Sequence, residues 1–242
     1  MGRQVGDEPH RVRQDGLVKT RQTNLAHRWT DALRISCNTA FGQLGLDLGD
    51  ALRDRARAFG FDADDLEAPT RVAASRFPDE TNPPQAAQSA IGQFDVRATP
   101  LQMALVAAGI ANGGSVMRPY LVQEVQGPDL STLSTADPEE WRRATSPEVA
   151  GQVAEMMELV VSDGSGTAAK IPGVRVAGKT GTAQHAQGRP PHAWFIGFAP
   201  AEDPQVAVAV VVEDGGSLGS EATGGRLAAP VAKAVMQAVL AP

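Results

Sequence analysis

The last third of this sequence carries the pattern that most restricts its fold. Three short runs rich in β-branched and aromatic residues fall at 174–177, 193–199 and 206–212, and Gly- and Pro-rich breaks separate them. Such runs are typical of β-strands. Because the breaks are too short to hold crossover helices, we expect the strands to be antiparallel neighbours in one sheet.

Helical periodicity dominates most of the remaining chain. Residues 62–97 lack it and are expected to form a long ordered loop. The last helix places Leu227, Val231, Val235 and Val239 on one face. Helices followed by strands and a closing helix predict an α+β fold, with a helical region and an antiparallel sheet on which the C-terminal helix packs. The expected helices lie at about 24–36, 39–48, 48–60, 98–114, 146–161 and 225–240.

The composition argues against several kinds of partner. The chain has 22 Lys and Arg residues against 28 Asp and Glu residues, which gives a net charge of −6. Nucleic acids and anionic membranes need a cationic face, so we expect neither as a partner. Because Cys37 is the only cysteine, no intramolecular disulfide can form.

No membrane span is expected in this sequence. The longest uncharged stretch, between Arg97 and Arg118, is interrupted by Pro, Asn and Gly residues. Residues 1–23 are polar and lack the apolar segment of a signal peptide, so we expect them to be a poorly ordered N-terminal remnant.

Residues 173–180 match the phosphate-binding pattern G-x-x-x-x-G-K-[ST]. A phosphate-binding loop of this kind needs a helix directly after its Lys-Thr pair, so that backbone N–H groups face the phosphates. Here the residues that follow, GTAQHAQGRPPHA, are not helix-forming, and the 63 residues after Lys179 are too few for a parallel nucleotide-binding sheet. A nucleotide-binding module is therefore the least favoured interpretation.

Two separated triplets support a different interpretation. Ser36-Cys37-Asn38 lies between two expected helices, and Lys179-Thr180-Gly181 lies 143 residues further on. Either triplet alone carries little information. In this order they resemble the second and third signature elements of penicillin-binding proteins and serine β-lactamases.

Four longer segments extend the resemblance. SCNTAFGQLGLDLG, TPLQMALVAAGIANGG with the following MRPYLV, GVRVAGKTGTAQ and HAWFIGFAP are similar to the transpeptidase domain of class B penicillin-binding proteins, especially the actinobacterial type. The similarity runs from about residue 24 to the C-terminus. It implies that residues 24–242 form a partial transpeptidase domain with a β-lactamase-like α+β fold, whose N-terminal part is missing.

The resemblance also implies a chemistry and a place. In this family a serine attacks the D-Ala-D-Ala end of a peptidoglycan stem peptide, and the acyl group then passes to a neighbouring strand. β-Lactams mimic that substrate. The resemblance therefore implies binding of stem peptides and β-lactams at the extracytoplasmic face of a bacterial membrane, with cell-wall synthesis or division proteins as possible partners, and it implies no cofactor.

Roles can be carried over to the matching positions. The resemblance implies that Ser36 passes protons near the nucleophile and that the Asn38 amide holds a peptide carbonyl. Lys179 and Thr180 would bind the terminal carboxylate through charge-assisted contacts.

The end of the same strand has implied roles as well. Gly181 would let the substrate backbone approach the strand, because any Cβ there would obstruct it. The backbone N–H of Thr182 would supply half of the oxyanion hole.

The sequence departs from the family at the nucleophile. No serine has a lysine three residues ahead, so the motif S-x-x-K is absent, and Thr167-Ala-Ala-Lys170 lies on the wrong side of Ser36 to replace it. We therefore expect the chain to start after its own nucleophile. A catalytically dead binding or scaffold domain remains the alternative.

Three further residues are given structural rather than chemical roles. His185 and His192 are interpreted as loop histidines, since no carboxylate or cysteine cluster shows ligand spacing, and no metal site is expected. Cys37 lacks an activating His/Asn arrangement and is interpreted as a small packed thiol.

Overall fold

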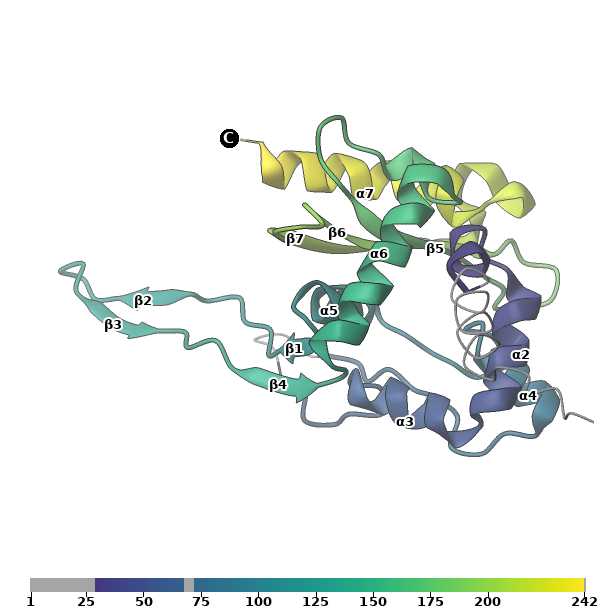
Figure 1. The fold of residues 1–242 in the computed structure, drawn as a ribbon. Coiled ribbons are helices and arrows are strands. Elements are labelled where there is room, and N and C mark those ends of the chain that lie inside the picture. Colours follow the sequence, from purple (N-terminus) through teal and green to yellow (C-terminus); the bar gives the residue numbers. More distant parts are fainter. Residues whose placement is uncertain (1–28, 68–71, 242) are drawn as a thin grey trace, which may run out of the picture.

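A computed structural model describes residues 29–67 and 72–241 of the chain (Figure 1). The expected boundary between residues 23 and 24 lies outside these residues. The first described segment is helical over residues 29–34. The helices that follow it are α2 (Asn38–Leu48), α3 (Asp50–Ala58), α4 (Pro83–Ser89), α5 (Pro100–Ala111), α6 (Pro147–Asp163) and α7 (Gly224–Leu240).

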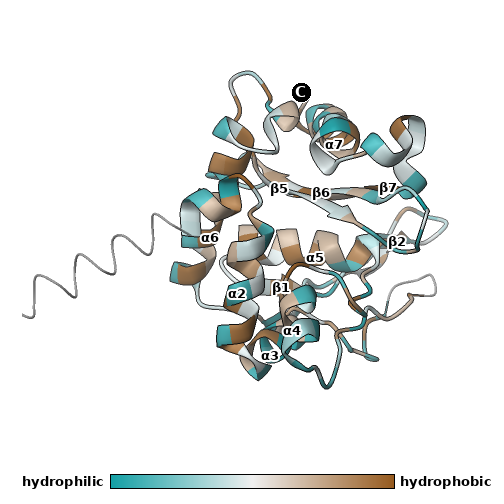
Figure 2. Cartoon of the chain, turned by 90° about the vertical axis from the view of Figure 1, so that its right-hand side faces the viewer, coloured by the Kyte–Doolittle hydropathy of each residue, from teal (hydrophilic) through white to brown (hydrophobic). Residues whose placement is uncertain are grey.

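The sheet confirms the antiparallel prediction. Strands β5 (Ala177–Ala183), β6 (His192–Ala199) and β7 (Val206–Val212) pair antiparallel in the order β5-β6-β7. Figure 2 shows α7 on one side of this sheet and α5 and α6 on the other. The layered α+β architecture places β5 at one edge, with β6 as its neighbour.

The core lies on both faces of the sheet. Phe195 and Phe198 are both buried, and because side chains alternate along a strand they point to opposite faces. Phe195 packs in the cluster that includes Met236 of α7, whereas Phe198 packs with Met157 of α6. The two aromatic rings thus fix β6 between the helical layers.

The outer face of α7 corrects one sequence expectation. Val231, Val235 and Val239 do share a face, but they are 47%, 42% and 56% exposed. The buried face carries small residues and one methionine instead, because alanines allow the helix to lie close to the sheet. These residues are Ala228, Ala229, Ala232 and Met236.

Helix α4 lies inside the segment expected to be a loop. Its N-cap is Asn82, whose side chain accepts a hydrogen bond from the Gln85 N–H, while the Gln85 side chain accepts one from the Asn82 N–H. Pro83 begins the helix, where the absence of an N–H costs nothing. The expectation of a loop across the whole of 62–97 was therefore wrong.

The start of the sheet was also misplaced. Of the run 174–177 only Ala177 belongs to β5, and Val174 makes a single bridge with Ile171. The strand runs from Ala177 through Lys179 and Thr180 to Ala183, which agrees with the strand-like character expected for the Lys-Thr-Gly triplet. A Lys-Thr pair inside a strand cannot cap a helix N-terminus, so the phosphate-binding interpretation of 173–180 was wrong.

Two small two-stranded antiparallel sheets complete the helical side. Strand β1 (Ser115–Met117) pairs with β4 (Glu140–Arg143), and β2 (Glu124–Gln126) pairs with β3 (Thr132–Thr135). The β2–β3 hairpin extends away from the rest of the chain as a long arm (Figure 1). Among the residues described, no helix has the length and hydropathy to cross a bilayer.

Candidate functional site

The turn that carries Ser36 joins the helix at 29–34 to α2. The Ser36 N–H donates to the Leu33 carbonyl at 3.1 Å and the Cys37 N–H to the Ala32 carbonyl at 2.8 Å. Ser36 adopts a φ of 59°, a backbone conformation that side-chain-bearing residues rarely take. Two backbone hydrogen bonds hold it there, so the direction of the Ser36 side chain is fixed by the turn.

The structure brings the two triplets together. The Lys179 ammonium donates to Ser36 Oγ at 2.7 Å and to the Thr180 carbonyl at 2.6 Å. Since Ser36 lies on a helical turn and Lys179 on the edge strand β5, this contact joins the helical region to the sheet. The family resemblance implied separate roles for the two residues and did not predict this direct contact.

Lys179 is held in an unusual electrostatic state. Burial lowers the pKa of its ammonium from 10.5 to about 8. Its hydrogen-bond partners are a hydroxyl and a carbonyl, and within 29–67 and 72–241 it forms no ion pair. Burying a charge is costly unless an opposite charge offsets it, so an anion placed near Lys179 would be strongly favoured.

A cleft of about 510 Å³ opens beside this lysine. Its lining includes residues 179–185, which are the end of β5 and the start of the loop after it, together with Trp194 and most of the segment 91–98. Its size and largely apolar lining are those of a small-molecule or peptide site. Asn38 is exposed at the start of α2 and is not among the residues that line the cleft.

Gly181 and Thr182 continue the cleft wall. A Cβ on Gly181 would lie 3.2 Å from the Cβ of Trp194, so the glycine also relieves crowding within the sheet. Thr182 is exposed and pairs in register with Ala193. Both residues line the cleft, and their roles toward a ligand stay predictions.

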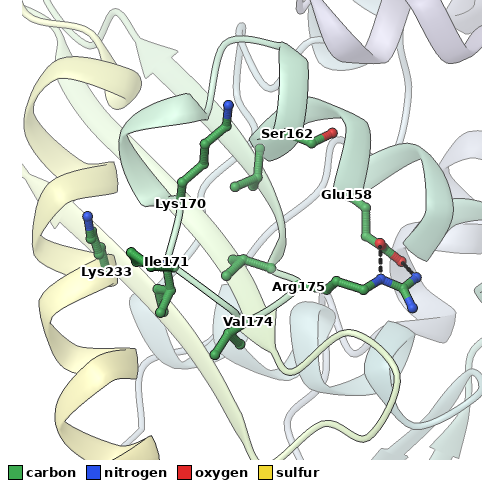
Figure 3. Close-up of a pocket in the computed structure, with 10 residues that line it drawn as sticks. Glu158, Ser162, Lys170, Ile171, Val174, Arg175 and Lys233 are labelled. Carbon is green, nitrogen blue, oxygen red and sulfur yellow. Dashed lines mark hydrogen bonds and ion pairs between the residues drawn. The ribbon is translucent and has the colours of Figure 1, made fainter.

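A second cavity of about 520 Å³ lies between α6, the segment before β5 and α7 (Figure 3). Its most prominent cation, Arg175, is already neutralised by a two-point contact with Glu158 at 2.8 and 2.9 Å. None of the signature residues lines it. We therefore place the functional site in the cleft beside Lys179.

Asp214, which contacts both histidines, was not predicted from the sequence, and the interpretation of His192 as a loop histidine was wrong because it is the first residue of β6. His185 Nε2 lies 2.9 Å from Asp214 Oδ1, and the Asp214 N–H donates to His192 Nδ1 at 3.0 Å. The imidazole rings are stacked with centroids 3.9 Å apart. Asp214 follows β7 and is distant in sequence, so no local pattern predicts it.

These three side chains are within the spacing of metal ligands, but their contacts disfavour a cation. The Arg189 guanidinium lies 2.6 Å from Asp214 Oδ2, and its hydrogen bond lowers the pKa of that carboxyl. The acceptor Nδ1 of His192 is occupied by a backbone N–H. The cluster instead connects the β5–β6 loop and the first residue of β6 to Asp214, which follows β7.

Comparison with known proteins shows the family of this chain. The family model for the penicillin binding protein transpeptidase domain matches residues 4–237. The chain belongs to this family, and its relatives place it with the actinobacterial class B proteins. Since the family match covers nearly the whole chain, the resemblance found in the sequence is confirmed.

Two curated mycobacterial proteins are similar to most of this chain. The chain is 50% identical over 214 residues to the peptidoglycan D,D-transpeptidase PbpA of Mycolicibacterium smegmatis, covering 87% of this chain and 43% of that protein. It is 46% identical over 243 residues to PbpA of Mycobacterium tuberculosis H37Rv, covering 99% of this chain and 46% of that protein. The chain thus spans about half the length of these curated relatives.

A solved structure shows the same fold. Penicillin-binding protein A from M. tuberculosis, in its ceftriaxone acyl-enzyme complex, superposes with a TM-score of 0.82 at 48% identity. The match covers 87% of this chain and 48% of that one. The expected transpeptidase-like α+β fold is confirmed.

Proposed function

We propose that this chain is the carboxylate-recognition part of a peptidoglycan D,D-transpeptidase and that it binds D-Ala-D-Ala stem peptides and β-lactams in the cleft beside Lys179. The observation that carries the proposal is the 2.7 Å contact between Lys179 Nζ and Ser36 Oγ at the wall of an apolar cleft. The acyl-enzyme complexes of the M. tuberculosis relative support the β-lactam part of the proposal.

The proposal gives each group a role. The Lys179 ammonium attracts the terminal carboxylate of the ligand, and Thr180 adds a hydroxyl donor. Because Ser36 Oγ accepts from Lys179, its own proton is free to reach the departing amine. The edge of β5 that faces away from β6 can hydrogen-bond an extended peptide as an added strand, with the Thr182 N–H directed to the developing oxyanion.

Covalent chemistry requires a nucleophilic serine with a lysine three residues ahead, and no serine in this sequence has one. Ser36 has Thr39, not a lysine, three residues ahead, and Lys179 is engaged by the recognition contacts. We therefore propose that the 242-residue chain forms no stable adduct with a fluorescent penicillin. Intact-mass spectrometry after incubation tests this, and an added acyl group mapped to Ser36 would refute it.

Non-covalent binding tests the recognition role directly. A ligand-observed NMR titration of the chain with diacetyl-L-Lys-D-Ala-D-Ala should show binding that the L-Ala-L-Ala peptide and the D-Ala-D-Ala carboxamide do not match. The preference for the carboxylate should decline as pH rises through about 8, because Lys179 then loses its charge. Equal binding of all three probes would contradict the proposal.

The absence of S-x-x-K supports a second candidate, a binding or scaffold domain that recognises stem peptides without reacting. The sequence of the gene upstream of Met1 separates the two. An S-x-x-K element there makes the chain the recognition part of an active enzyme. In either case we propose an extracytoplasmic location and contact with other cell-wall synthesis or division proteins.

A further inference from the structure

Ser165 belongs to no signature motif, but its side chain reaches strand β5, which carries Lys179 and Thr180. Its hydroxyl lies 2.7 Å from Thr180 Oγ1. Thr180 is only 9% exposed, so its hydroxyl has little access to bulk water as an alternative partner. The direction of the Thr180 proton therefore depends on which of the two hydroxyls donates to the other.

The backbone of Ser165 is held on two sides. Its N–H donates to the Arg34 carbonyl at 3.1 Å. A Cβ on the preceding Gly164 would lie 2.3 Å from that same carbonyl, and one on Gly225 would lie 2.4 Å from the Ser165 carbonyl. Glycine at both positions lets the loop after α6 fit closely between the Ser36 turn and the first turn of α7.

Arg34 connects this loop to the Ser36 turn a second time. Its guanidinium donates to the Asp163 carbonyl at 2.9 Å and to Asp163 Oδ2 at 3.3 Å. Arg34 lies two residues before Ser36 in the chain. The loop 163–165 thus joins the turn that carries Ser36 to the strand that carries Thr180.

We propose that Ser165 is a positioning residue that donates its proton to Thr180 Oγ1 and so leaves the Thr180 proton directed at a ligand carboxylate. A hydroxyl donates one hydrogen bond and accepts up to two, so a Thr180 oxygen that accepts from Ser165 keeps its own donor for the ligand. The inference rests on the proposed function, since it requires a carboxylate beside Lys179.

Substitution of Ser165 separates positioning from a purely structural role. In Ser165→Ala the Thr180 hydroxyl loses its donor and can turn away from the cleft. We expect about fivefold weaker binding of the D-Ala-D-Ala carboxylate probe, the effect of one lost hydrogen bond. Binding of the D-Ala-D-Ala carboxamide should not change, because that probe lacks the acceptor that Thr180 recognises.

Three further variants keep the result interpretable. Ser165→Cys retains the volume but donates weakly, so it should lose affinity as the alanine variant does, whereas Ser165→Thr keeps the hydroxyl and should restore binding. Ser162→Ala, three residues earlier and exposed, is the matched control and should behave as the wild type. Thermal unfolding of each variant confirms that it is folded.

The outcomes separate the two proposals. Equal binding of carboxylate and carboxamide by the wild-type chain overturns the proposed function and the role of Ser165 together. A wild-type preference that survives in Ser165→Ala and Ser165→Cys overturns the role of Ser165 alone. Equal losses for both probes also overturn it, because they show general damage to the cleft.

Discussion

The buried charge of Lys179 gives the fold a dependence on pH that one substitution should remove. Burial lowers the pKa of this lysine from 10.5 to about 8 in the folded chain. At about 1.4 kcal/mol for each tenfold change in proton affinity, the folded state at neutral pH carries a penalty of about 3 kcal/mol. Between pH 8 and 10.5 the unfolded chain binds more protons, so the free energy of unfolding rises with pH in this window.

Lys179→Met keeps a long unbranched side chain and removes the charge. It also removes the donors to Ser36 and Thr180, which costs about 1 kcal/mol for each hydrogen bond at every pH. That loss is independent of pH, whereas the charge penalty is not. The stability of the variant relative to the wild type should therefore fall by about 3 kcal/mol from pH 7.5 to pH 10.5.

Urea unfolding of both proteins at several pH values measures this difference. Taking the difference cancels the other titrating groups, and Lys233→Met, which removes a lysine from α7 outside the cleft, is the matched control. A difference between wild type and Lys179→Met that stays constant within about 0.5 kcal/mol across this range would refute the argument.

Other predictions follow from particular contacts. Gly151 lies on an exposed face of α6, where an added Cβ would meet no neighbour, so Gly151→Ala should raise the free energy of unfolding in urea by about 0.5–1 kcal/mol. Gly45→Ala would place a Cβ 2.3 Å from the Cβ of Ala90 and should lower it. Strand β7 has no second partner among the described strands, so light scattering should show concentration-dependent association; a monomer over a wide concentration range would oppose this. Asp214→Ala removes the contacts of the β5–β6 loop, including the Arg189 ion pair, and limited proteolysis should then cut between residues 184 and 191 faster than in the wild type.

Local pattern predicted the sheet better than the helical region. The apolar run 206–212 coincides with β7, because a short valine-rich run between turn residues strongly favours a strand. Helix α4 was missed because two consecutive prolines suggested a loop, although Asn82 and Gln85 form the capping pair that begins a helix. The exposed valines of α7 show that close packing can favour alanine over a larger apolar residue at the sheet.

Site residues were predicted only where they belong to a signature motif. Lys179 and Ser36 were each predicted as site residues through the family resemblance, whereas their direct hydrogen bond was found only in the structure. Ser165 and Asp214 were not predicted, because their contacts are tertiary and leave no regular spacing in the sequence. Whether Asn38 contacts a ligand remains a prediction from the resemblance.

The neutral surroundings of Lys179 link ligand binding to proton uptake. A carboxylate that enters the cleft supplies the opposite charge that the lysine lacks, and the pKa of Lys179 rises toward its ordinary value. Near pH 8 to 9 a part of the chains must therefore take up a proton as the ligand binds. The heat of binding in this range then depends on the ionisation enthalpy of the buffer, while at pH 6 it does not. Proton uptake, measured as the buffer dependence of the binding heat, therefore reports that a carboxylate has bound beside Lys179.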